Sequence, residues 1–404
     1  MPNTEFGPKY IIEIGSNRNQ SKLGELGKEK TVAAMKSLLC ICSIGLFISV
    51  SCLIEPAKAV IKVGIAGDLS GSALTAGEQQ EIGALKAIDH LNDKGGLLGQ
   101  EIVAISADDA CDRQQAKAVA RQMVSEGIVF IVGHVCSDAS LAVSKIYEET
   151  GIIMISPAST NPKVTDKGGN NVFRVIGRDD QQGTIAGNFL ADNHSKENIA
   201  IMHDNTAYSM GLAEFTKRQL NKRGVTEAIF DSYKPDQKDY QSIVEILFKL
   251  KIDILYAGGM ESDIGIILRQ AKKTLPNLRL ISADGLVSPD FLRYAGKAGE
   301  GTYFTFGPDM RLKPEAENVA EAIRTEDAYE PDGYTLYSYG AVQAWAQAVQ
   351  QAGTFKPDAV IKTLKTGTFN TVIGKIGFDE KGDVTGISTF VWYVYGKETY
   401  SLAK

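Results

Sequence analysis

Two consecutive apolar runs of the chain are each followed by a turn rich in hydroxyl groups, a pattern that can bind an anion. The segment GHVCSD at 133–138 follows the first run, and SPAST at 156–160 follows the second. Backbone N–H groups at a helix start attract anions, and Ser or Thr hydroxyls add donors. Two such turns on neighbouring strands would hold one carboxylate. Helix capping by Ser137 and Thr160 is the alternative, and the spacing alone favours capping.

The second half of the chain offers groups that could meet the positive end of a ligand. Asp284 follows an apolar run and could pair with a cation, although an aspartate before a glycine is equally typical of a plain turn. Tyr208 ends the segment HDNTAY at 203–208, which follows another apolar run, and could close over a ligand. We therefore take both residues as candidate ligand contacts.

Catalysis and metal binding are not indicated. His134, Ser137 and Asp138 lie within five residues, whereas the members of a hydrolytic triad normally converge from separate elements. The chain has no G-x-S-x-G elbow and no G-x-x-x-x-G-K-[ST] loop, and its glycines lack dinucleotide-binding spacing. The four histidines are scattered without metal-ligand spacing: His90, His134, His194 and His203. We expect no enzyme, no metal and no cofactor.

Strand and helix patterns alternate from residue 61 onward. Apolar β-branched runs predict strands, and apolar residues at helical spacing predict helices. The first series predicts strands at 61–65, 102–106, 128–132 and 152–155, and helices at 77–94, 113–126 and 139–150. This alternation predicts the α/β class, with a parallel sheet and helices on both faces.

The same alternation restarts in the middle of the chain, which predicts a second α/β unit. It predicts helices at 181–193, 211–223, 240–250 and 264–275, and strands at 199–202, 228–233, 252–256 and 278–282. The last third predicts helices at 314–328 and 338–351, a hairpin of 372–374 with 378–383, and a strand at 389–395. Ligands of open α/β sheets bind outside the carboxyl ends of the strands, where the candidate residues stand.

Residues 35–59 have the pattern of a secretion signal. Lys36 supplies the positive start, an apolar stretch of 17 residues follows at 38–54, and a small-x-small cleavage site ends at Ala59. Cleavage there would start the mature chain near Val60 and place it in the periplasm.

Two alternatives to a cleaved signal stay open. One is an uncleaved membrane anchor, whose apolar stretch is at the short limit for spanning a bilayer. The other is a lipid attached to Cys52. The polar residues 1–34 do not fit a signal, and we interpret them as an over-extended N-terminus.

Composition indicates an acidic chain of two domains. Without residues 1–59, which hold seven of the 43 basic and five of the 49 acidic residues, 345 residues with a net charge of −8 remain. That length usually exceeds a single hydrophobic core. Acidic, well-mixed charge argues against nucleic acid or an anionic membrane as a partner.

Two cysteines remain behind the signal, Cys111 and Cys136. An even pair in an exported chain favours a disulfide. Two buried free thiols are the alternative.

From about Val60 to its end, the chain resembles the periplasmic leucine/isoleucine/valine-binding proteins of bacterial amino-acid uptake. The likeness rests on KVGIAGDLSG at 62–71, DDACD at 108–112, GHVCSD at 133–138, PAST at 157–160, HDNTAY at 203–208, YAGG at 256–259, ILRQA at 267–271 and FDEKGD at 378–383. The resemblance implies a type I periplasmic binding protein fold, in which two lobes close over a ligand in their cleft. It also implies a disulfide between the two cysteines. We expect the lobes at 60–180 plus 308–385 and at 181–307 plus 386–404.

The resemblance also implies how an α-amino acid would be held. Its α-carboxylate would meet the hydroxyls of Ser137 and Thr160 and backbone amides. Its α-ammonium would meet the Ala158 carbonyl and Asp284, and Tyr208 would close from the second lobe. Asp284 stands where a glutamate is usual, so its arm is one methylene shorter, and we expect the contact to shift or to recruit water.

Around the ligand side chain, the resemblance implies a pocket of Val135, Cys136 and Tyr334. Two positions depart from the leucine-binding pattern, because Ala76 and Met260 stand where aromatic residues line that pocket. Losing two rings enlarges the pocket, and methionine adapts to varied shapes. An α-amino acid is therefore expected, but leucine itself does not follow.

Proteins of this kind serve an ABC importer, so the resemblance implies a free amino acid and a membrane permease as partners of a monomer. An amino-acid or amide sensor is the alternative. A sensor would usually carry a transmembrane helix and a signalling domain, or lie in the cytoplasm. The apparent cleavable signal favours import.

Overall fold

The structure is a computed structural model that describes residues 60–388 and 390–403. The predicted signal, its cleavage site and residues 1–34 lie outside the described residues. None of the described helices is long and apolar enough to cross a membrane. Two large β-sheets and one small sheet organise the described chain.

The first sheet has five parallel strands in the order β2-β1-β3-β4-β5. The strands are β1 (Val60–Gly67), β2 (Glu101–Asp108), β3 (Phe130–Gly133), β4 (Ile153–Ser156) and β5 (Val172–Arg174). Strands β3 and β4 are buried along their whole length, as expected where helices cover both faces. Val132 pairs with Ile155, so the two hydroxyl-rich turns leave the sheet side by side.

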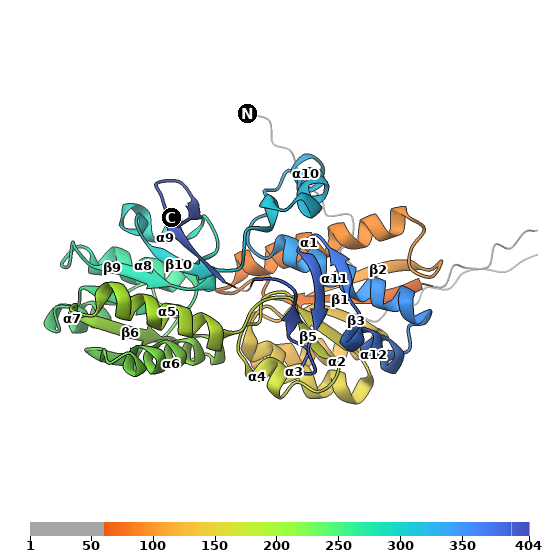
Figure 1. The fold of residues 1–404 in the computed structure, drawn as a ribbon, viewed down its shortest axis with the longest axis horizontal. Helices are drawn as coiled ribbons and strands as arrows, with labels where there is room; N and C mark the ends of the chain where they lie inside the picture. Colours follow the sequence, from red (N-terminus) through yellow and green to blue (C-terminus); the bar gives the residue numbers. More distant parts are fainter. Residues whose placement is uncertain (1–59, 389, 404) are drawn as a thin grey trace, which may run out of the picture. The chain divides into compact units, whose positions relative to one another are not determined.

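Two layers of helices cover the faces of the first sheet (Figure 1), and the side chains of its strands alternate between these layers. Phe130 and Val132 pack toward α1 and α11, where Phe130 stacks on Trp345 with ring centroids 4.5 Å apart. Ile131 packs toward α2 and α3 on the other face. The helices are α1 (Leu74–Asp93), α2 (Arg113–Ser125), α3 (Ser137–Thr150), α11 (Thr335–Ala352) and α12 (Pro357–Thr366).

The second sheet has seven strands in the order β15-β14-β10-β9-β8-β6-β7. Strands β6 to β10 are parallel, and β14 and β15 add an antiparallel edge. They are β6 (Ile199–His203), β7 (Ile229–Ser232), β8 (Ile254–Ala257), β9 (Arg279–Ser282), β10 (Tyr303–Phe306), β14 (Val391–Tyr395) and β15 (Tyr400–Leu402).

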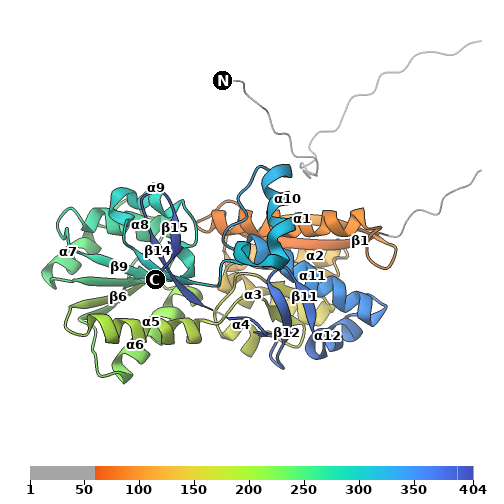
Figure 2. The ribbon, with the colours of Figure 1, turned by 45° about the horizontal axis from the view of Figure 1, so that its top comes forward.

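Helices also cover both faces of the second sheet (Figure 2). In β6, Ile199 and Ile201 pack toward α5 (Asp179–His194) and α6 (Ala207–Lys222). Ala200 and Met202 pack toward the opposite layer, which contains α7 (Gln241–Lys249) and α8 (Glu261–Ala271). The alternation explains why β6 reads as a continuous apolar run in the sequence.

The chain passes between the two sheets three times within the described residues, before α5, before α11 and before β14. We call the first sheet with its helices lobe 1 and the second sheet with its helices lobe 2. The small sheet consists of β11 (Phe369–Thr371), β12 (Gly374–Phe378) and β13 (Val384–Thr385). Shorter helices are α4 (Lys163–Asp166), α9 (Phe291–Ala295) and α10 (Glu317–Glu326), with a 3₁₀ turn η1 (Asp284–Leu286). We propose the lobe bounds 60–180 plus 308–385 and 181–307 plus 386–404.

The predicted strand and helix series are confirmed, but the predicted hairpin is wrong. Residues 372 and 373 form the turn between β11 and β12, and 379–383 form the turn between β12 and β13. The Asp379 carboxylate accepts the N–H groups of Lys381 and Asp383, both at 2.9 Å. These groups therefore need no strand partner. The predicted helix at 314–328 begins with a 3₁₀ turn, and α10 starts only at Glu317.

A disulfide joins Cys111, in the turn before α2, to Cys136, the residue before α3. The predicted pairing is confirmed, and the alternative of two free thiols is wrong. The bond ties the end of β2 to the first hydroxyl-rich turn.

We expect reduction of this disulfide to lower the free energy of unfolding by about 3–4 kcal/mol, because the unfolded chain regains the freedom of a loop of 25 positions. Thermal unfolding with and without reductant measures the effect, with a Cys111→Ser/Cys136→Ser double variant as the control that reductant leaves unchanged. Two thiols that alkylate in the native exported protein before reduction would contradict the expectation.

Candidate ligand-binding site

Hydrogen bonds of serine hydroxyls connect the two hydroxyl-rich turns. Ser156 Oγ and Ser159 Oγ both donate to the carbonyl oxygen of His134, at 2.7 and 3.0 Å. The N–H of Asn161 donates to Ser137 Oγ at 3.2 Å. All five residues are buried, so these bonds are shielded from water. The turns form one rigid unit at the carboxyl ends of β3 and β4.

Neither candidate hydroxyl caps a helix, so the capping alternative is wrong. Helix α3 begins at Ser137 itself, and its N-cap residue, Cys136, provides no side-chain cap. The Thr160 hydroxyl is fully buried, and among the described residues it acts on the Asp179 carboxylate. Thr160 remains a candidate ligand contact, and Asp179 competes for its hydroxyl.

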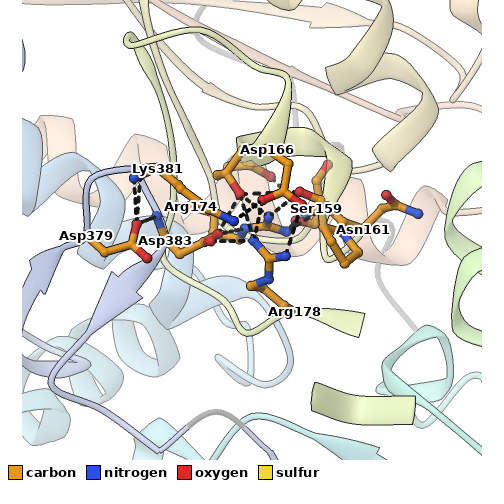
Figure 3. A network of polar contacts seen from close by, with 12 residues as sticks. Ser159, Asn161, Asp166, Arg174, Arg178, Asp379, Lys381 and Asp383 are labelled. Carbon is orange, nitrogen blue, oxygen red and sulfur yellow. Dashed lines mark hydrogen bonds and ion pairs between the residues drawn. The ribbon is translucent and has the colours of Figure 1, made fainter. Parts of the chain in front are cut away.

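The buried guanidinium of Arg174 supports the second turn (Figure 3). It donates to the carbonyl oxygens of Ser159 and Asn161, both at 3.0 Å, on either side of Thr160. Its Nε donates to Asp383 Oδ1 at 2.6 Å. A buried charge is tolerated where it is paired and hydrogen-bonded in this way.

Asp383 links this support to the C-terminal part of lobe 1. Its Oδ2 accepts from Arg178 at 2.6 Å, and Arg178 also pairs with Asp166 and Asp180. Burial raises the pKa of Asp383, but the charge and hydrogen bonds of its partners outweigh burial and hold the pKa below its usual value. The segment FDEKGD therefore positions the turn that carries Thr160.

Three donors hold the carboxylate of Asp284, which follows β9. Gln182 Nε2 and Tyr208 OH donate to Oδ1 at 2.6 and 2.9 Å, and Tyr334 OH donates to Oδ2 at 2.8 Å. Asp284 is only 2% exposed. Burial raises its pKa, and the three hydrogen bonds offset part of this rise. The structure thus brings together three of the candidate residues.

A second carboxylate, that of Asp179 at the start of α5, lies close to Asp284. Asp179 is fully buried, and among the described residues the Thr160 hydroxyl is the side-chain donor that acts on its carboxylate. Burial and the charge of Asp284 raise the pKa of Asp179 well above its usual value, and the Thr160 hydroxyl and the Arg174 charge offset only part of this rise. Because Asp284 has three donors and Asp179 only this one, we assign the proton to Asp179 and the negative charge to Asp284.

Buried polar groups also fix the elements of lobe 1 that face lobe 2. Asp68 accepts the N–H of Ala73 at 2.7 Å and so shapes the turn before α1. Gln79 Oε1 accepts the N–H of Tyr334 at 3.1 Å, and Gln79 Nε2 donates to Asp332 at 3.1 Å. These bonds fix the position from which the Tyr334 hydroxyl reaches lobe 2.

A cavity lies between the lobes. It is lined by Thr75, Ala76, Gln79, Val135, Cys136, Ser137, Ala158, Tyr208, Met260, Glu261, Asp284, Gly285, Val287, Ser288 and Tyr334. Eight of the nine candidate ligand residues are in this lining; Thr160 is not. Among the described residues, the lining contains two carboxylates, those of Glu261 and Asp284, and no Lys, Arg or His.

Hydrogen bonds across the cleft show that the two lobes are closed on each other. The N–H of Ala207, the first residue of α6 in lobe 2, donates to Asp138 Oδ2 of lobe 1 at 2.6 Å. The Ala207 carbonyl accepts from Asn161 Nδ2 at 2.6 Å. A carboxylate at a helix N-terminus is favourable, so Asp138 stabilises the closed arrangement.

The residues considered for catalysis do not converge. The ring of His134 contacts Asp109 Oδ2 at 2.5 Å and Tyr147 OH at 3.0 Å, and all three side chains are fully buried. Ser137 instead accepts from a backbone N–H, and Asp138 binds across the cleft. No group of three or more metal-ligating side chains occurs in the part of the chain that the structure describes.

Known proteins agree with this architecture. Residues 60–395 match the model of the family described as periplasmic binding protein. The chain belongs to this family. The resemblance inferred from the sequence and the type I periplasmic binding protein fold are both confirmed.

Relatives in this family align with nearly the whole described chain. Leu/Ile/Val-binding protein homolog 1 of Brucella suis biovar 1 is 39% identical over 339 residues, 83% of this chain and 91% of the relative. The leucine-, isoleucine-, valine-, threonine- and alanine-binding protein of Pseudomonas aeruginosa is 34% identical and covers 84% and 90%. A leucine binding protein structure from Thermotoga maritima has a TM-score of 0.79 at 26% identity and covers 85% and 98%.

Glu261 is a cavity carboxylate that the sequence patterns did not single out. It is the first residue of α8, where an acidic residue normally serves the helix N-terminus at the surface. Here it is only 7% exposed. Burial raises its pKa to about 7; its own N–H and the Thr75 hydroxyl offset part of the rise, and the charges of Asp290 and Asp68 add to it.

Replacing Glu261 by Gln should change how stability depends on pH. The pKa is about 7 in the folded protein and 4.5 in an unfolded chain, so folding favours the protonated form. Wild type therefore loses stability as the pH rises from about 4.5 through 7, by on the order of 1–3 kcal/mol, whereas Glu261→Gln has no such loss. Urea unfolding of the ligand-free proteins from pH 4.5 to 8 measures the difference.

The matched control is Glu245→Gln, because Glu245 is exposed on α7. Its stability curve should run parallel to that of wild type. Parallel curves for Glu261→Gln and wild type would show that the Glu261 pKa is not raised.

Proposed function

We propose that this protein is the periplasmic solute-binding component of an ABC importer and captures a free α-amino acid by closure of its two lobes. The observation that carries the proposal is the cavity between the lobes, which combines Ser137 at the start of α3 with the buried carboxylate of Asp284. One end of this cavity suits an anion and the other suits a cation. A zwitterion satisfies both ends at once.

The ligand α-carboxylate binds at the start of α3. The first N–H groups of a helix have no acceptor within the helix, and those of α3 follow Cys136 directly at the cavity. The Ser137 hydroxyl adds a donor there. We assign the Thr160 hydroxyl, which is buried next to the Asp179 carboxylate and is not itself in the cavity lining, to the same carboxylate site.

The ligand α-ammonium binds at Asp284 and the carbonyl oxygen of Ala158, both in the cavity lining. Asp284 is oriented by Tyr208 from lobe 2 and by Tyr334 from lobe 1. A carboxylate bound by groups from both lobes responds to closure, so ligand binding and closure stabilise each other. Gln182 prevents Asp284 from turning away from the cavity.

The ligand side chain lies among the remaining lining residues. By position these include Val135 and Cys136 of lobe 1, Met260 of lobe 2, and Ala76 at the start of α1. The names of the relatives from Brucella and Pseudomonas specify leucine, isoleucine, valine, threonine and alanine as their ligands. These names support an α-amino acid as the ligand class here.

Delivery to a membrane permease completes the proposed function. Support comes from the secretion-signal pattern that ends at Ala59 and from the match to the periplasmic binding protein family. We propose a mature, monomeric periplasmic protein that starts near Val60. Mass spectrometry of the exported protein tests this start, and a lipid on Cys52 or a retained apolar stretch would contradict it.

Ser137→Ala and Thr160→Ala should each weaken amino-acid binding by about ten- to a hundredfold. A hydrogen bond to a charged group contributes about 1.5–3 kcal/mol, which corresponds to that factor. Asp284→Asn keeps the size but removes the charge, so the affinity should fall for every amino acid. Calorimetry of protein unfolded, freed of ligand and refolded measures these affinities.

Ser242→Ala, at an exposed position of α7, is the matched control and should bind as wild type does. Circular dichroism of each variant separates loss of binding from loss of folding. Wild-type affinity in a folded Asp284→Asn protein would show that another group binds the ligand ammonium. Wild-type affinity in both Ser137→Ala and Thr160→Ala would show that these hydroxyls do not bind the ligand carboxylate.

A further inference from the structure

The cavity holds two carboxylates in separate surroundings. Asp284 is hydrogen-bonded by Gln182, Tyr208 and Tyr334. Glu261 comes from the start of α8, and the groups that act on it are Thr75 and the charges of Asp290 and Asp68. Glu261 and Asp284 share no hydrogen-bond partner, so one ligand ammonium at Asp284 leaves Glu261 without a counter-charge.

A structural role does not account for Glu261. An acidic side chain favours a helix N-terminus, but the same benefit is available at the surface, where hydration is retained. Glu261 instead is more than nine-tenths buried and lines the cavity. No ion pair with Glu261 occurs among residues 60–388 and 390–403. A buried carboxylate in this state is expensive unless something neutralises it.

We propose that the ligand is an α-amino acid whose side chain ends in a positively charged group, and that Glu261 is the counter-ion of that group. This inference rests on the proposed function, because it assumes that the α-carboxylate and α-ammonium of the ligand bind at Ser137 and Asp284. It assigns the second positive charge of the ligand to the second cavity carboxylate.

The rest of the lining fits such a side chain. Ala76, Met260 and Val287 provide apolar contacts for a methylene stem, and methionine adapts to stems of different length. Thr75 and Ser288 add hydroxyls that can accept from an ammonium or guanidinium. An aliphatic side chain such as that of leucine would leave the Glu261 carboxylate without a positively charged partner.

The protonation of Glu261 determines how binding of a positively charged side chain should depend on pH. The groups that act on Glu261 are the carboxylates of Asp290 and Asp68 and the Thr75 hydroxyl, and the Glu261 charge acts in turn on Tyr334 and Tyr395. Both tyrosines have pKa values raised well above the usual value by burial, so they stay neutral. Glu261, with a pKa of about 7, is thus charged at pH 8 and mostly protonated at pH 6.

The test compares L-lysine with L-norleucine, which has the same methylene stem and lacks only the terminal ammonium. Calorimetry on ligand-free wild-type protein should show L-lysine binding about ten- to a hundredfold more tightly than L-norleucine at pH 8. This ratio should shrink severalfold at pH 6, where Glu261 carries a proton. L-Ornithine, L-arginine, L-glutamine and L-leucine complete the panel.

Glu261→Gln should remove most of the preference for L-lysine while binding L-norleucine at least as well as wild type. The exposed control Glu245→Gln should keep the wild-type ratio. Because the two ligands are compared in wild type at two pH values, the test stands even where the Glu261 variant fails to fold.

The outcomes separate this inference from the proposed function. Equal binding of L-lysine and L-norleucine, or tighter binding of L-leucine or L-glutamine than of every cationic amino acid, overturns the inference and leaves α-amino-acid binding intact. A ratio that is independent of pH, or unchanged in a folded Glu261→Gln protein, removes Glu261 as the counter-ion. Failure of all amino acids to bind overturns the proposed function itself.

Discussion

The negative charge of Asp284 is buried between the lobes with three hydrogen-bond donors, while no basic side chain lines the same cavity in the described chain. Hydrogen bonds alone compensate only part of the cost of burying a charge. Two of the donors, Tyr208 and Tyr334, come from opposite lobes, so the carboxylate is at the point where closure brings the lobes together. A positively charged group would complete this arrangement, and we propose that the ligand bound by the rest of the site supplies it.

Arg174, which is also fully buried, is paired within the chain. It contacts Asp383 and donates to the carbonyl oxygens of Ser159 and Asn161. By contrast, no basic side chain of the described chain lines the cavity that contains Asp284 and Glu261. We propose that the pair of Arg174 and Asp383 keeps the turn with Thr160 fixed while the lobes open and close.

Sequence patterns predicted the fold and placed the turns with Ser137 and Thr160 together, because parallel strands bring their carboxyl ends to one edge. Val135, Cys136, Ala158, Met260 and Tyr334 came only from the family resemblance, since no local pattern marks them as cavity residues. Periodicity could not reveal Glu261, since a glutamate at a helix start looks like an ordinary surface residue, and only the closed cleft buries it. The buried carboxylate of Asp179 could not be predicted either, because its burial depends on how the start of α5 packs.

We propose that the ligand must supply a positively charged group beside Asp284. The most direct measurement compares, by calorimetry, the tightest-binding amino acid of the panel with its des-amino carboxylic acid, which keeps the carboxylate and the side chain. We expect the des-amino acid to bind at least a hundredfold more weakly, on the order of 3 kcal/mol, because it leaves Asp284 unneutralised. Equal affinity for the two compounds would contradict this requirement, since the site would then recognise a carboxylate and a side chain without any need for the ammonium.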